Sequence, residues 1–575
     1  MMVTSSKSVL LLIVAAASIL RLYGLAHDPV ALNQDEAVNG YDAYSLGLTL
    51  RDHHGNLLPV ALQSFGDWAS PLLTYITVPF VRLFGLSTWS IRLPVALFGI
   101  ASVPLLYVLV RKLFGRNDVA LVAAGLLAIA PWSIITSREA LPPNIIPFFT
   151  ILFILALLWA AEEGRGNATS TVRAAVAAAV GALLTYSYPT QKLFVPLMIV
   201  AAVLIYFRRR PACACILVGV FVLLVTPIYV LLIAHPESNF RFKDVVLPGG
   251  PLHRLGGFAL RYVLYLSPIA LFGRGNADLT YDVPGIGRNF AVLAPFFYLG
   301  VFFTTLTATR RLQAPMRRSD AALLLTWLAL FPVAGSLTAT HMHLLRAIHG
   351  FPLVPIFSAA GFLWLTRAVA SATVATAAQV SMTCVALFAT LDFSQSYLTK
   401  YPDASKARFQ YGLAELFTFV LPHQAQFGSI VVDAKINQPY VYVLFYSRWD
   451  PRKIDYHEVD GGEKAHVVRL GKFRFEAVTE QRIAKARLIF RVDDGSRTWY
   501  SAYDVRGTLV VKQGVPRDDT KVSFRRRDGR QEWQPRRRRC ITAHGSVRVL
   551  VARPVFKCAW LGPQRSRRVP TSLVL

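Results

Sequence analysis

The chain opens with an apolar run, Val9–Leu20 (VLLLIVAAASIL), and soon afterwards reaches an acidic pair inside the stretch Leu32–Tyr44 (LNQDEAVNGYDAY). An apolar helix of about 20 residues crosses a bilayer core, so the run predicts a first membrane helix. Asp35 and Glu36 then follow close to the lipid–water boundary. A carboxylate at that depth costs free energy unless it is solvated or takes part in binding or catalysis. We therefore take this stretch as the edge of a functional site.

Long apolar runs recur along the chain and define its class. Of its 575 residues 54% are apolar, and they gather in runs that a soluble core does not need. We predict a mainly α-helical protein with a polytopic transmembrane bundle over residues 1–391. On length the bundle has about 11 spans, near residues 8–26, 90–110, 119–136, 144–161, 172–187, 191–207, 213–234, 289–308, 321–339, 348–366 and 373–391.

Basic residues indicate how this bundle lies in the membrane. The net charge is +28, and much of it sits in short links between alternate runs, such as 208–210 and 310–318. This is the pattern of cytoplasmic loops and not of a nucleic-acid surface. We expect a multi-pass protein of the cytoplasmic membrane with its N-terminus inside. The first outer loop is then 27–88 and the second 235–288.

Three further segments differ in composition from the predicted spans. Pro71–Leu86 is apolar but too short to span, and we expect a helix at the membrane interface. Residues 392–524 hold runs of β-forming residues and one helical segment, which predicts a small α/β domain outside the membrane. Residues 525–575 carry clusters of arginine without a matching apolar pattern, and we expect a disordered tail or the product of a shifted reading frame.

Asp35 and Glu36 are the first candidates for chemistry. Taken alone, they could be solvated loop residues or acids that cap a helix. Asp67, in the same loop, adds a third carboxylate at the same depth. Cationic side chains stand in the facing outer links, at Arg138, Lys192, His341, His343 and Arg346.

Acids and cations at the outer lipid boundary suit the transfer of a sugar from a polyprenyl phosphate. The leaving group is an anionic phosphate at headgroup depth, and fixed cations stabilise the charge that grows on it. The incoming hydroxyl is a poor nucleophile, and a carboxylate that takes its proton typically contributes about 10²–10⁴-fold. A divalent metal held by further acids could also serve the phosphate. A nucleotide-sugar donor would be cytoplasmic, and the sequence has no Gly-rich phosphate loop on that side.

Several motifs of residues 8–390 occur in the same order in one group of enzymes. They are Arg21-Leu22-Tyr23-Gly24, Asp35-Glu36, Ser64-Phe65-Gly66-Asp67, Pro71-Leu72, Arg92-Leu93-Pro94, Ala130-Pro131-Trp132 with Ser137-Arg138, Tyr186-Ser187-Tyr188 with Lys192, and Arg346. In this combination they resemble the polytopic glycosyltransferase family of the protein O-mannosyltransferases and the lipid A aminoarabinose transferase. Pro439–Pro451 is similar to the outer domain of some bacterial members.

The resemblance implies a glycosyltransferase-C fold, an inverting reaction and a polyprenyl-phosphate sugar donor. It implies that Asp35 is the base at the acceptor and that Glu36 supports it or orients the acceptor. Asp67 matches a position that binds a metal or the substrate in some members. Lys192 matches a lysine that faces the lipid phosphate, and Arg138 matches a phosphate or substrate contact.

The remaining candidates have plainer readings beside them. His341 and His343 alternate next to Arg346, and they are either interfacial histidines or substrate contacts. Arg82 and Arg92 are expected to anchor helices at the interface and not to bind a ligand.

The sequence thus predicts a membrane glycosyltransferase that moves a sugar from a polyprenyl phosphate to a lipid, protein or glycan acceptor at the outer face. No nucleic acid partner is expected. The alternative is a transporter or flippase of lipid-linked glycans, which would place ionisable groups or broken helices near the bilayer midplane. A third reading is an inactive membrane scaffold.

Overall fold

The structure is a computed structural model. It describes residues 5–65, 67–162, 167–235, 246–273, 278–312, 316–339, 343–459, 467–494, 497–514, 537–542 and 545–550.

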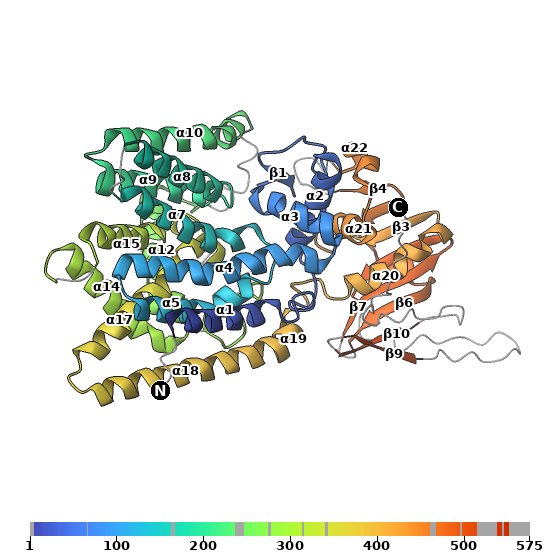
Figure 1. Ribbon diagram of the computed structural model, residues 1–575. Helices are drawn as coiled ribbons and strands as arrows, with labels where there is room; N and C mark the ends of the chain where they lie inside the picture. The colour runs from blue at the N-terminus through green and yellow to red at the C-terminus, as the bar shows by residue number, and fades with distance from the viewer. Residues whose placement is uncertain are drawn as a thin grey trace, which may run out of the picture.

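A bundle of long helices makes up most of the molecule, and every segment predicted to span the membrane contains a helix (Figure 1). The mainly α-helical fold class is therefore confirmed. The helices of the bundle are α1 (Ser6–Leu22), α4 (Thr88–Phe114), α5 (Asn117–Ile129), α6 (Pro131–Thr136), α7 (Ile146–Ala161), α8 (Asn167–Thr185), α9 (Gln191–Ala202), α10 (Pro211–Ala234), α14 (Ala294–Ala308), α15 (Arg318–Leu330), α16 (Val333–Ser336), α17 (Leu353–Ala368) and α18 (Ala372–Thr399).

Short turns extend several of these helices. A π-helical turn, η2, continues α9, and the others are 3₁₀ turns that precede α7, α14 and α17. Their bounds are η1 (Pro142–Ile145), η2 (Val203–Phe207), η4 (Ala291–Leu293), η5 (Leu344–Arg346) and η6 (Ile348–Gly350).

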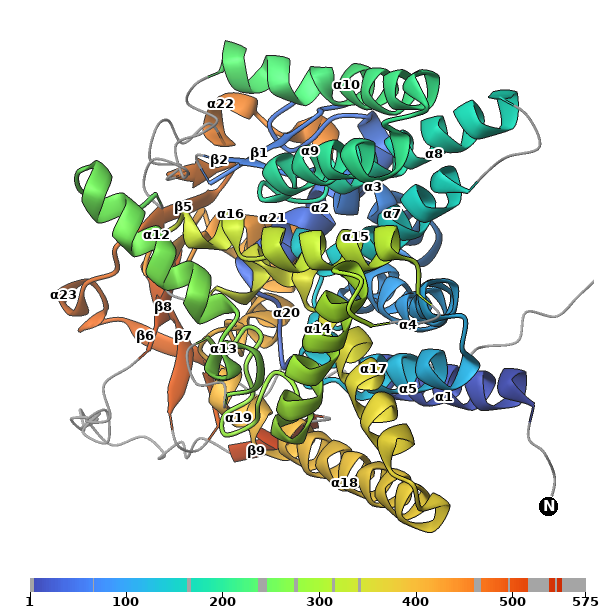
Figure 2. The same cartoon turned by 90° about the vertical axis from the view of Figure 1, so that its left-hand side faces the viewer.

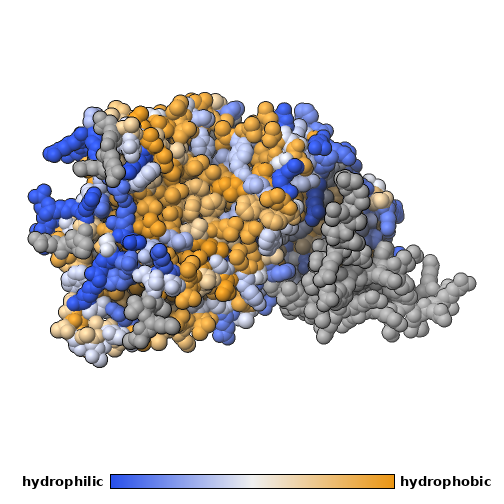
Figure 3. All heavy atoms as spheres, in the orientation of Figure 1, coloured by the Kyte–Doolittle hydropathy of each residue, from blue (hydrophilic) through white to orange (hydrophobic). Residues whose placement is uncertain are grey.

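The bundle has the surface of a membrane protein. Within the described residues, eight helices are long and apolar enough to cross a bilayer, and three apolar helices are shorter, at Leu72–Phe84, Asn117–Ile129 and Gln191–Phe207. Apolar side chains form a broad band across the bundle in Figure 3, between two ends that are rich in hydrophilic residues. Figure 2 shows α10 and α18 on opposite edges of the bundle.

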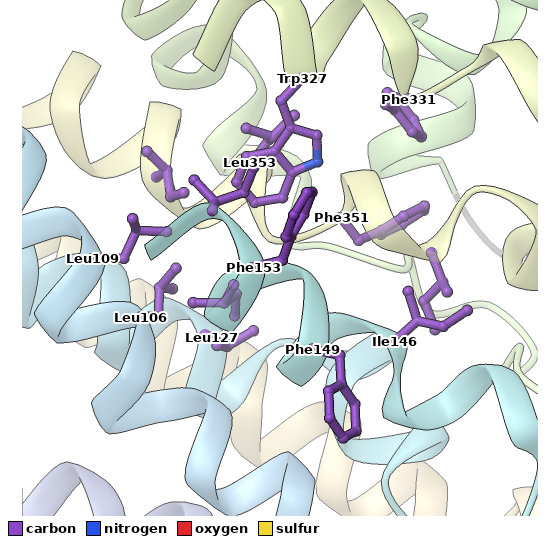
Figure 4. Close-up of a cluster of buried hydrophobic side chains, with 14 of the residues drawn as sticks. Leu106, Leu109, Leu127, Ile146, Phe149, Phe153, Trp327, Phe331, Phe351 and Leu353 are labelled. Atoms are coloured by element: carbon purple, nitrogen blue, oxygen red, sulfur yellow. The ribbon is translucent and has the colours of Figure 1, made fainter. Parts of the chain in front are cut away.

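The interior of the bundle is filled by large apolar side chains. Trp327 of α15, Phe351 and Leu353 at the start of α17, and Phe153 of α7 meet leucines of α4 and α5 (Figure 4). These four side chains are at most 2% exposed. Packing of this kind holds α15 and α17 against the first half of the bundle, where the acidic pair is attached.

One end of the bundle, which we call the site end, carries the first loop (Figure 1). This loop folds into α2 (Gln34–Thr49), the hairpin of β1 (Leu62–Ser64) and β2 (Asp67–Ala69), and α3 (Leu72–Phe84). The helix predicted over Pro71–Leu86 is thus present as α3. The second loop contains two helices that were not predicted, α12 (Pro251–Tyr265) and α13 (Pro268–Phe272).

A small α/β unit at the C-terminus adjoins the site end, as predicted. Its strand order is β4-β5-β3-β8-β7-β6-β10-β9, with β3 parallel to both β5 and β8 and antiparallel pairing elsewhere. Its strands are β3 (Ser429–Asp433), β4 (Arg469–Leu470), β5 (Phe473–Glu476), β6 (Arg487–Asp493), β7 (Thr498–Val505), β8 (Thr508–Gln513), β9 (Arg537–Thr542) and β10 (Gly545–Leu550).

The helices of this unit are α19 (Tyr401–Ser405), α20 (Leu413–His423), α21 (Pro439–Ser447), α22 (Tyr456–Val459) and α23 (Glu480–Ile483), with the 3₁₀ turns η7 (Gln424–Gln426) and η8 (Pro451–Lys453). In Figure 1, α20 and α21 lie on the side of the sheet that faces the bundle, and α23 packs on the other face of the sheet. β9 and β10 fall within the predicted basic tail, 525–575, and most of that tail lies outside the described residues. The predicted limits at 391 and 524 stay predictions.

The C-terminal unit shares a hydrophobic core with the first loop. Val38 and Tyr41 of α2 belong to the same buried cluster as Val441 and Phe445 of α21. The hydroxyl of Tyr41 also donates to the carbonyl of Trp449 at 2.8 Å. The helix that carries the acidic pair is therefore packed on one side against a segment about 400 residues later in the chain.

Candidate active site

The acidic pair lies in the first turn of α2. Asn33 is the N-cap, and its side chain accepts from the backbone N–H of Glu36 at 2.9 Å. The Glu36 carboxylate accepts in return from the backbone N–H of Asn33 at 3.4 Å, which completes a capping box. The unpaired N–H groups at a helix start favour negative charge, so both acids sit where the backbone stabilises a carboxylate.

Glu36 is fully buried and saturated with donors. Arg92 of α4 donates from Nε to Oε1 at 2.8 Å and from Nη2 to Oε2 at 2.9 Å, and the N–H of Ala140 donates to Oε1 at 2.9 Å. Neither Glu36 nor Arg92 is exposed. The prediction that Arg92 is an interfacial anchor is therefore wrong, because the guanidinium is paired inside the protein. Glu36 joins α2, α4 and the segment before η1.

Asp35 has a different environment, although it is the next residue along the chain. Its side chain is only partly buried, whereas that of Glu36 is fully buried. Burial raises the pKa of the Tyr442 phenol of α21 well above its usual value, with smaller contributions from Tyr446 and Tyr500 and then from the charge of Asp35. Of the two acids, Asp35 is thus the more exposed one.

Arg138 lies in the backbone framework of the bundle. Its Nη1 donates to the carbonyls of Leu20 and Arg21 at 3.1 and 3.2 Å, and its Nε donates to the carbonyl of Asp28 at 3.2 Å. The first two carbonyls are at the end of α1, where the helix supplies no donors. Arg138 is 1% exposed, and this geometry favours a capping role over the phosphate contact that the sequence predicted.

Arg21 has the reciprocal role. It donates from Nη1 to the carbonyl of Ala128 at 2.9 Å and from Nη2 to that of Leu127 at 3.3 Å, both near the end of α5. Its Nη2 also donates to the hydroxyl of Ser133 at 2.8 Å. Arg138 therefore caps α1, the helix in which Arg21 lies, and Arg21 caps α5.

Glu139 is a buried acid that the sequence did not single out. It is 1% exposed, and its Oε1 has no hydrogen-bond partner within the described residues. Burial, followed by the charge of Glu36, raises its pKa well above the usual value. Arg92 opposes this shift, but its charge is already matched by Glu36. The signal in the sequence was the charged link Ser137–Glu139.

Lys192 and Asp67 come from separate parts of the chain, and the charge of Asp67 acts on the Lys192 ammonium. Lys192 is the second residue of α9, and Asp67 is among the charged groups that act on it. Asp67 opens β2, where it pairs with Ser64 across the hairpin. The hairpin therefore brings a carboxylate near the predicted phosphate lysine.

His343 ends a hydrogen-bonded chain from the second loop. The hydroxyl of Tyr281 is 2.9 Å from Oδ2 of Asp278 and 2.8 Å from Nε2 of His343. Burial opposes the charge of Asp278, but hydrogen bonds from the side chain and backbone of Thr280 lead to a lowered pKa, so this carboxylate is an acceptor. Tyr281 then donates to Asp278, and His343 donates from Nε2 to Tyr281. This leaves the Nδ1 lone pair of His343 as an acceptor.

Arg346 lies beside His343. Burial and then the charge of Arg346 lower the pKa of His343 to about 4, so the imidazole is neutral at physiological pH. The Nη1 of Arg346 and the Nδ1 of His343 are buried and have no hydrogen-bond partner within the described residues. The Arg346 guanidinium thus offers a donor, and the His343 ring offers an acceptor beside it. His341 lies outside the described residues.

A metal site was expected, if anywhere, at Asp67. Within the described part of the chain, no group of three or more His, Cys, Asp or Glu side chains is arranged to hold a metal ion. The metal role of Asp67 stays a prediction.

Known proteins with related sequences cover part of the chain. Residues 69–233 match the family model of the dolichyl-phosphate-mannose-protein mannosyltransferases. The putative mannosyltransferases YycA and YkcB of Bacillus subtilis (strain 168) are 30% identical over 159 residues and 29% identical over 160 residues. These alignments take in 27% of this chain and 22% and 21% of the relatives, so the match spans about a fifth of their length.

Two solved structures are similar to this chain at lower identity. ArnT from Cupriavidus metallidurans, bound to undecaprenyl phosphate, is 15% identical with a TM-score of 0.48, over 76% of this chain and 84% of that one. The oligosaccharyltransferase AglB from Archaeoglobus fulgidus, in complex with an inhibitory peptide and a dolichol-phosphate, is 14% identical with a TM-score of 0.43, over 68% of this chain and 56% of that one.

The family resemblance predicted from the sequence motifs is thus confirmed where the family model aligns. Over residues 69–233 this chain is similar to the dolichyl-phosphate-mannose-protein mannosyltransferases.

Proposed function

We propose that the protein is a membrane glycosyltransferase that moves a sugar from a polyprenyl phosphate to a hydroxyl acceptor at the outer face of the membrane, with inversion. The observation that carries this proposal is the contrast between two adjacent acids. Glu36 is fully buried and bound by Arg92, whereas Asp35 is only partly buried at the same helix start. Such a pair supplies one acid for structure and one for chemistry.

In the proposed reaction Asp35 takes the proton of the acceptor hydroxyl. The acceptor oxygen forms a bond to the anomeric carbon, while the bond from that carbon to the phosphate oxygen breaks on the opposite face. The leaving group is polyprenyl phosphate, which needs little help from an acid. Proton removal by a positioned carboxylate typically contributes about 10²–10⁴-fold.

The phosphate is proposed to bind between Lys192 and Arg346. Both are cations at the site end, and a charge fixed before the reaction stabilises the growing phosphate charge without reorganisation. Nδ1 of His343 would accept a hydrogen bond from a hydroxyl of the sugar, because Tyr281 occupies Nε2 of the same ring. Asp67 would orient Lys192 or contact the donor. No step is assigned to a metal.

The orientation of the protein in the membrane belongs to the same proposal. We place the N-terminus in the cytoplasm, and the site end and the C-terminal unit on the outer face, because basic residues favour cytoplasmic links. Asp403 of α19, whose side chain is 76% exposed, offers a test of this orientation. A membrane-impermeant thiol reagent should label Asp403→Cys in intact cells. Labelling only after the cells are opened would place the C-terminal unit in the cytoplasm and contradict the proposed orientation.

The activity is tested in membranes supplied with radiolabelled polyprenyl-phosphate sugars, with the acceptors extracted by class. Wild type should transfer label, Asp35→Asn should lose at least about 100-fold of the rate, and Asp403→Asn should keep the wild-type rate. Full transfer by correctly folded Asp35→Asn would exclude Asp35 as the base. If wild type moves no label, transbilayer movement of the labelled lipid in the same membranes would instead support a flippase.

A further inference from the structure

Gln191 and His349 form a polar pair deep inside the bundle. Nε2 of Gln191 lies 3.2 Å from Nδ1 of His349, and neither residue is exposed. The imidazole otherwise meets aromatic rings, with that of Phe194 at 4.2 Å between ring centroids. Because the amide nitrogen only donates, Nδ1 of His349 is the acceptor, and its proton is on Nε2.

This pair is costly where it lies. Within the described residues Oε1 of Gln191 has no hydrogen-bond partner, and the His349 imidazole lies near the backbone of Phe331 without a hydrogen bond of ordinary geometry at Nε2. Buried polar groups in apolar surroundings cost free energy, and a matched apolar pair would serve stability at least as well. A buried polar contact of this kind is best explained by the one register that it selects between two segments.

The two segments carry Lys192 and Arg346, the two cations proposed above to bind the phosphate. Gln191 directly precedes Lys192 at the start of α9, and His349 follows Arg346 by three residues in the turns η5 and η6. The hydrogen bond from Gln191 to His349 therefore ties the backbone of Lys192 to that of Arg346.

Both sides of this tie are fixed further by neighbouring helices. The hydroxyl of Tyr229 of α10 donates to the carbonyl of Lys192 at 2.7 Å. The indole of Trp327 of α15 donates to the carbonyl of His349 at 2.9 Å. Trp327 itself stands in the buried cluster shown in Figure 4. The main chain at Lys192 and at His349 is thus held by neighbouring helices, and Lys192 and Arg346 are each only partly buried.

We propose that Gln191 and His349 are positioning residues that set the separation of Lys192 and Arg346, so that both cations reach one lipid-linked phosphate. This rests on the proposed function. Neither residue touches the phosphate. The pair acts through the register of α9 against the segment before α17, and it is expected to change the affinity for a phosphate more than the stability of the fold.

The test measures binding of undecaprenyl phosphate to the purified full-length protein in detergent, with undecaprenol as the uncharged control, together with thermal unfolding. Gln191→Met/His349→Leu removes both polar groups at similar volume. We expect an unfolding temperature equal to or above that of wild type, and about 5- to 30-fold weaker binding of undecaprenyl phosphate. Binding of undecaprenol should not change.

Two further variants sharpen this result. The exchange Gln191→His/His349→Gln can restore a hydrogen bond between the same positions, and it should recover affinity to within about threefold of wild type. Tyr206→Phe is the matched control, because the Tyr206 hydroxyl donates to Asp320 at 2.8 Å at the other end of the same helical segment. It should leave the affinity unchanged.

Each contrary outcome has one meaning. If the apolar pair binds undecaprenyl phosphate as tightly as wild type while Lys192→Met binds it weakly, the positioning role is wrong and the donor site stands. Failure of the exchange to recover affinity also overturns the pairing. If Lys192→Met and Arg346→Gln both bind as wild type, the proposed donor site itself is wrong.

Discussion

Glu36 and Arg92, 56 residues apart in the chain, are joined by two hydrogen bonds of 2.8 and 2.9 Å with neither side chain exposed to solvent. Such a buried pair is costly to form but far more costly to break, because the remaining charge has no partner. It attaches the first turn of α2 to the bundle and so fixes the position of Asp35.

Glu36→Gln should therefore destabilise the fold. We expect a loss of about 3–5 kcal/mol, because the guanidinium of Arg92 is left buried without a counter-charge. Thermal unfolding in detergent checks this. Glu36→Gln/Arg92→Met should recover part of the loss, since the orphaned charge is gone. If Glu36→Gln keeps the wild-type unfolding temperature and still loses transfer, Glu36 acts in the chemistry and not in the framework.

Arg138→Met should also lower stability and leave phosphate binding intact. The substitution leaves the carbonyls of Leu20, Arg21 and Asp28 without their donor, and each unsatisfied buried group costs about 1–3 kcal/mol. Unfolding temperature and undecaprenyl phosphate affinity, measured on the same sample, check this. Lys192→Met should give the opposite pattern. Weaker phosphate binding by Arg138→Met without a change in unfolding would restore the contact that the sequence predicted.

Two adjacent histidines in the first loop should give stability opposite dependences on pH. Burial lowers the pKa of His54 from 6.5 to about 2. Below pH 6.5 the unfolded chain therefore binds a proton at His54 that the folded chain does not bind, and stability falls. Burial opposes the charge of His53 as well, but Asp42 at 2.7 Å raises its pKa above 6.5. His53 therefore adds stability in acid, and this gain is lost as the pH rises through its folded pKa.

Unfolding temperatures between pH 4.5 and 7.5 check these signs. His54→Gln should reduce the loss of stability below pH 6.5, because the proton taken up on unfolding is gone. His53→Gln should instead remove the gain in stability that appears as the pH falls through the folded pKa of His53 to 6.5, and it should leave the slope below pH 6.5 unchanged. Parallel curves for wild type and both variants would mean that burial does not hold His54 neutral and that Asp42 does not hold the charge of His53.

Gly40 is the point at which α2 meets the C-terminal unit. A Cβ there would lie 2.8 Å from Ile91 Cγ2 and 2.9 Å from Phe445 Cε2. Gly40→Ala should cost about 1–3 kcal/mol by forcing α2 away from α4 or α21. Gly40→Ala/Phe445→Leu should recover part of this in thermal unfolding. Gly219→Ala in α10 is the control, since a Cβ there meets nothing within 4 Å, and a loss of equal size in that variant would contradict the steric account.

The helical framework follows from the sequence alone. A segment in a bilayer must satisfy its backbone hydrogen bonds within its own helix, so length and apolar content are enough to locate it. This is why a helix stands at each predicted span, and why the short run Pro71–Leu86 forms α3. The α/β character of the C-terminal unit was likewise visible in runs such as Arg487–Val492, which became β6.

The environments of the candidate residues, by contrast, depend on the three-dimensional arrangement of the whole chain. Asp35 and Glu36 are neighbours with the same chemistry, and their difference comes from Arg92, Ala140 and Tyr442, which lie far away in the chain. Whether a carboxylate is buried and paired depends on residues that are distant in the chain, and it cannot be predicted from the local sequence. For the same reason Arg92 was mistaken for an interfacial anchor, and the tie between Gln191 and His349 could be recognised only once α9 and the segment before α17 were seen together.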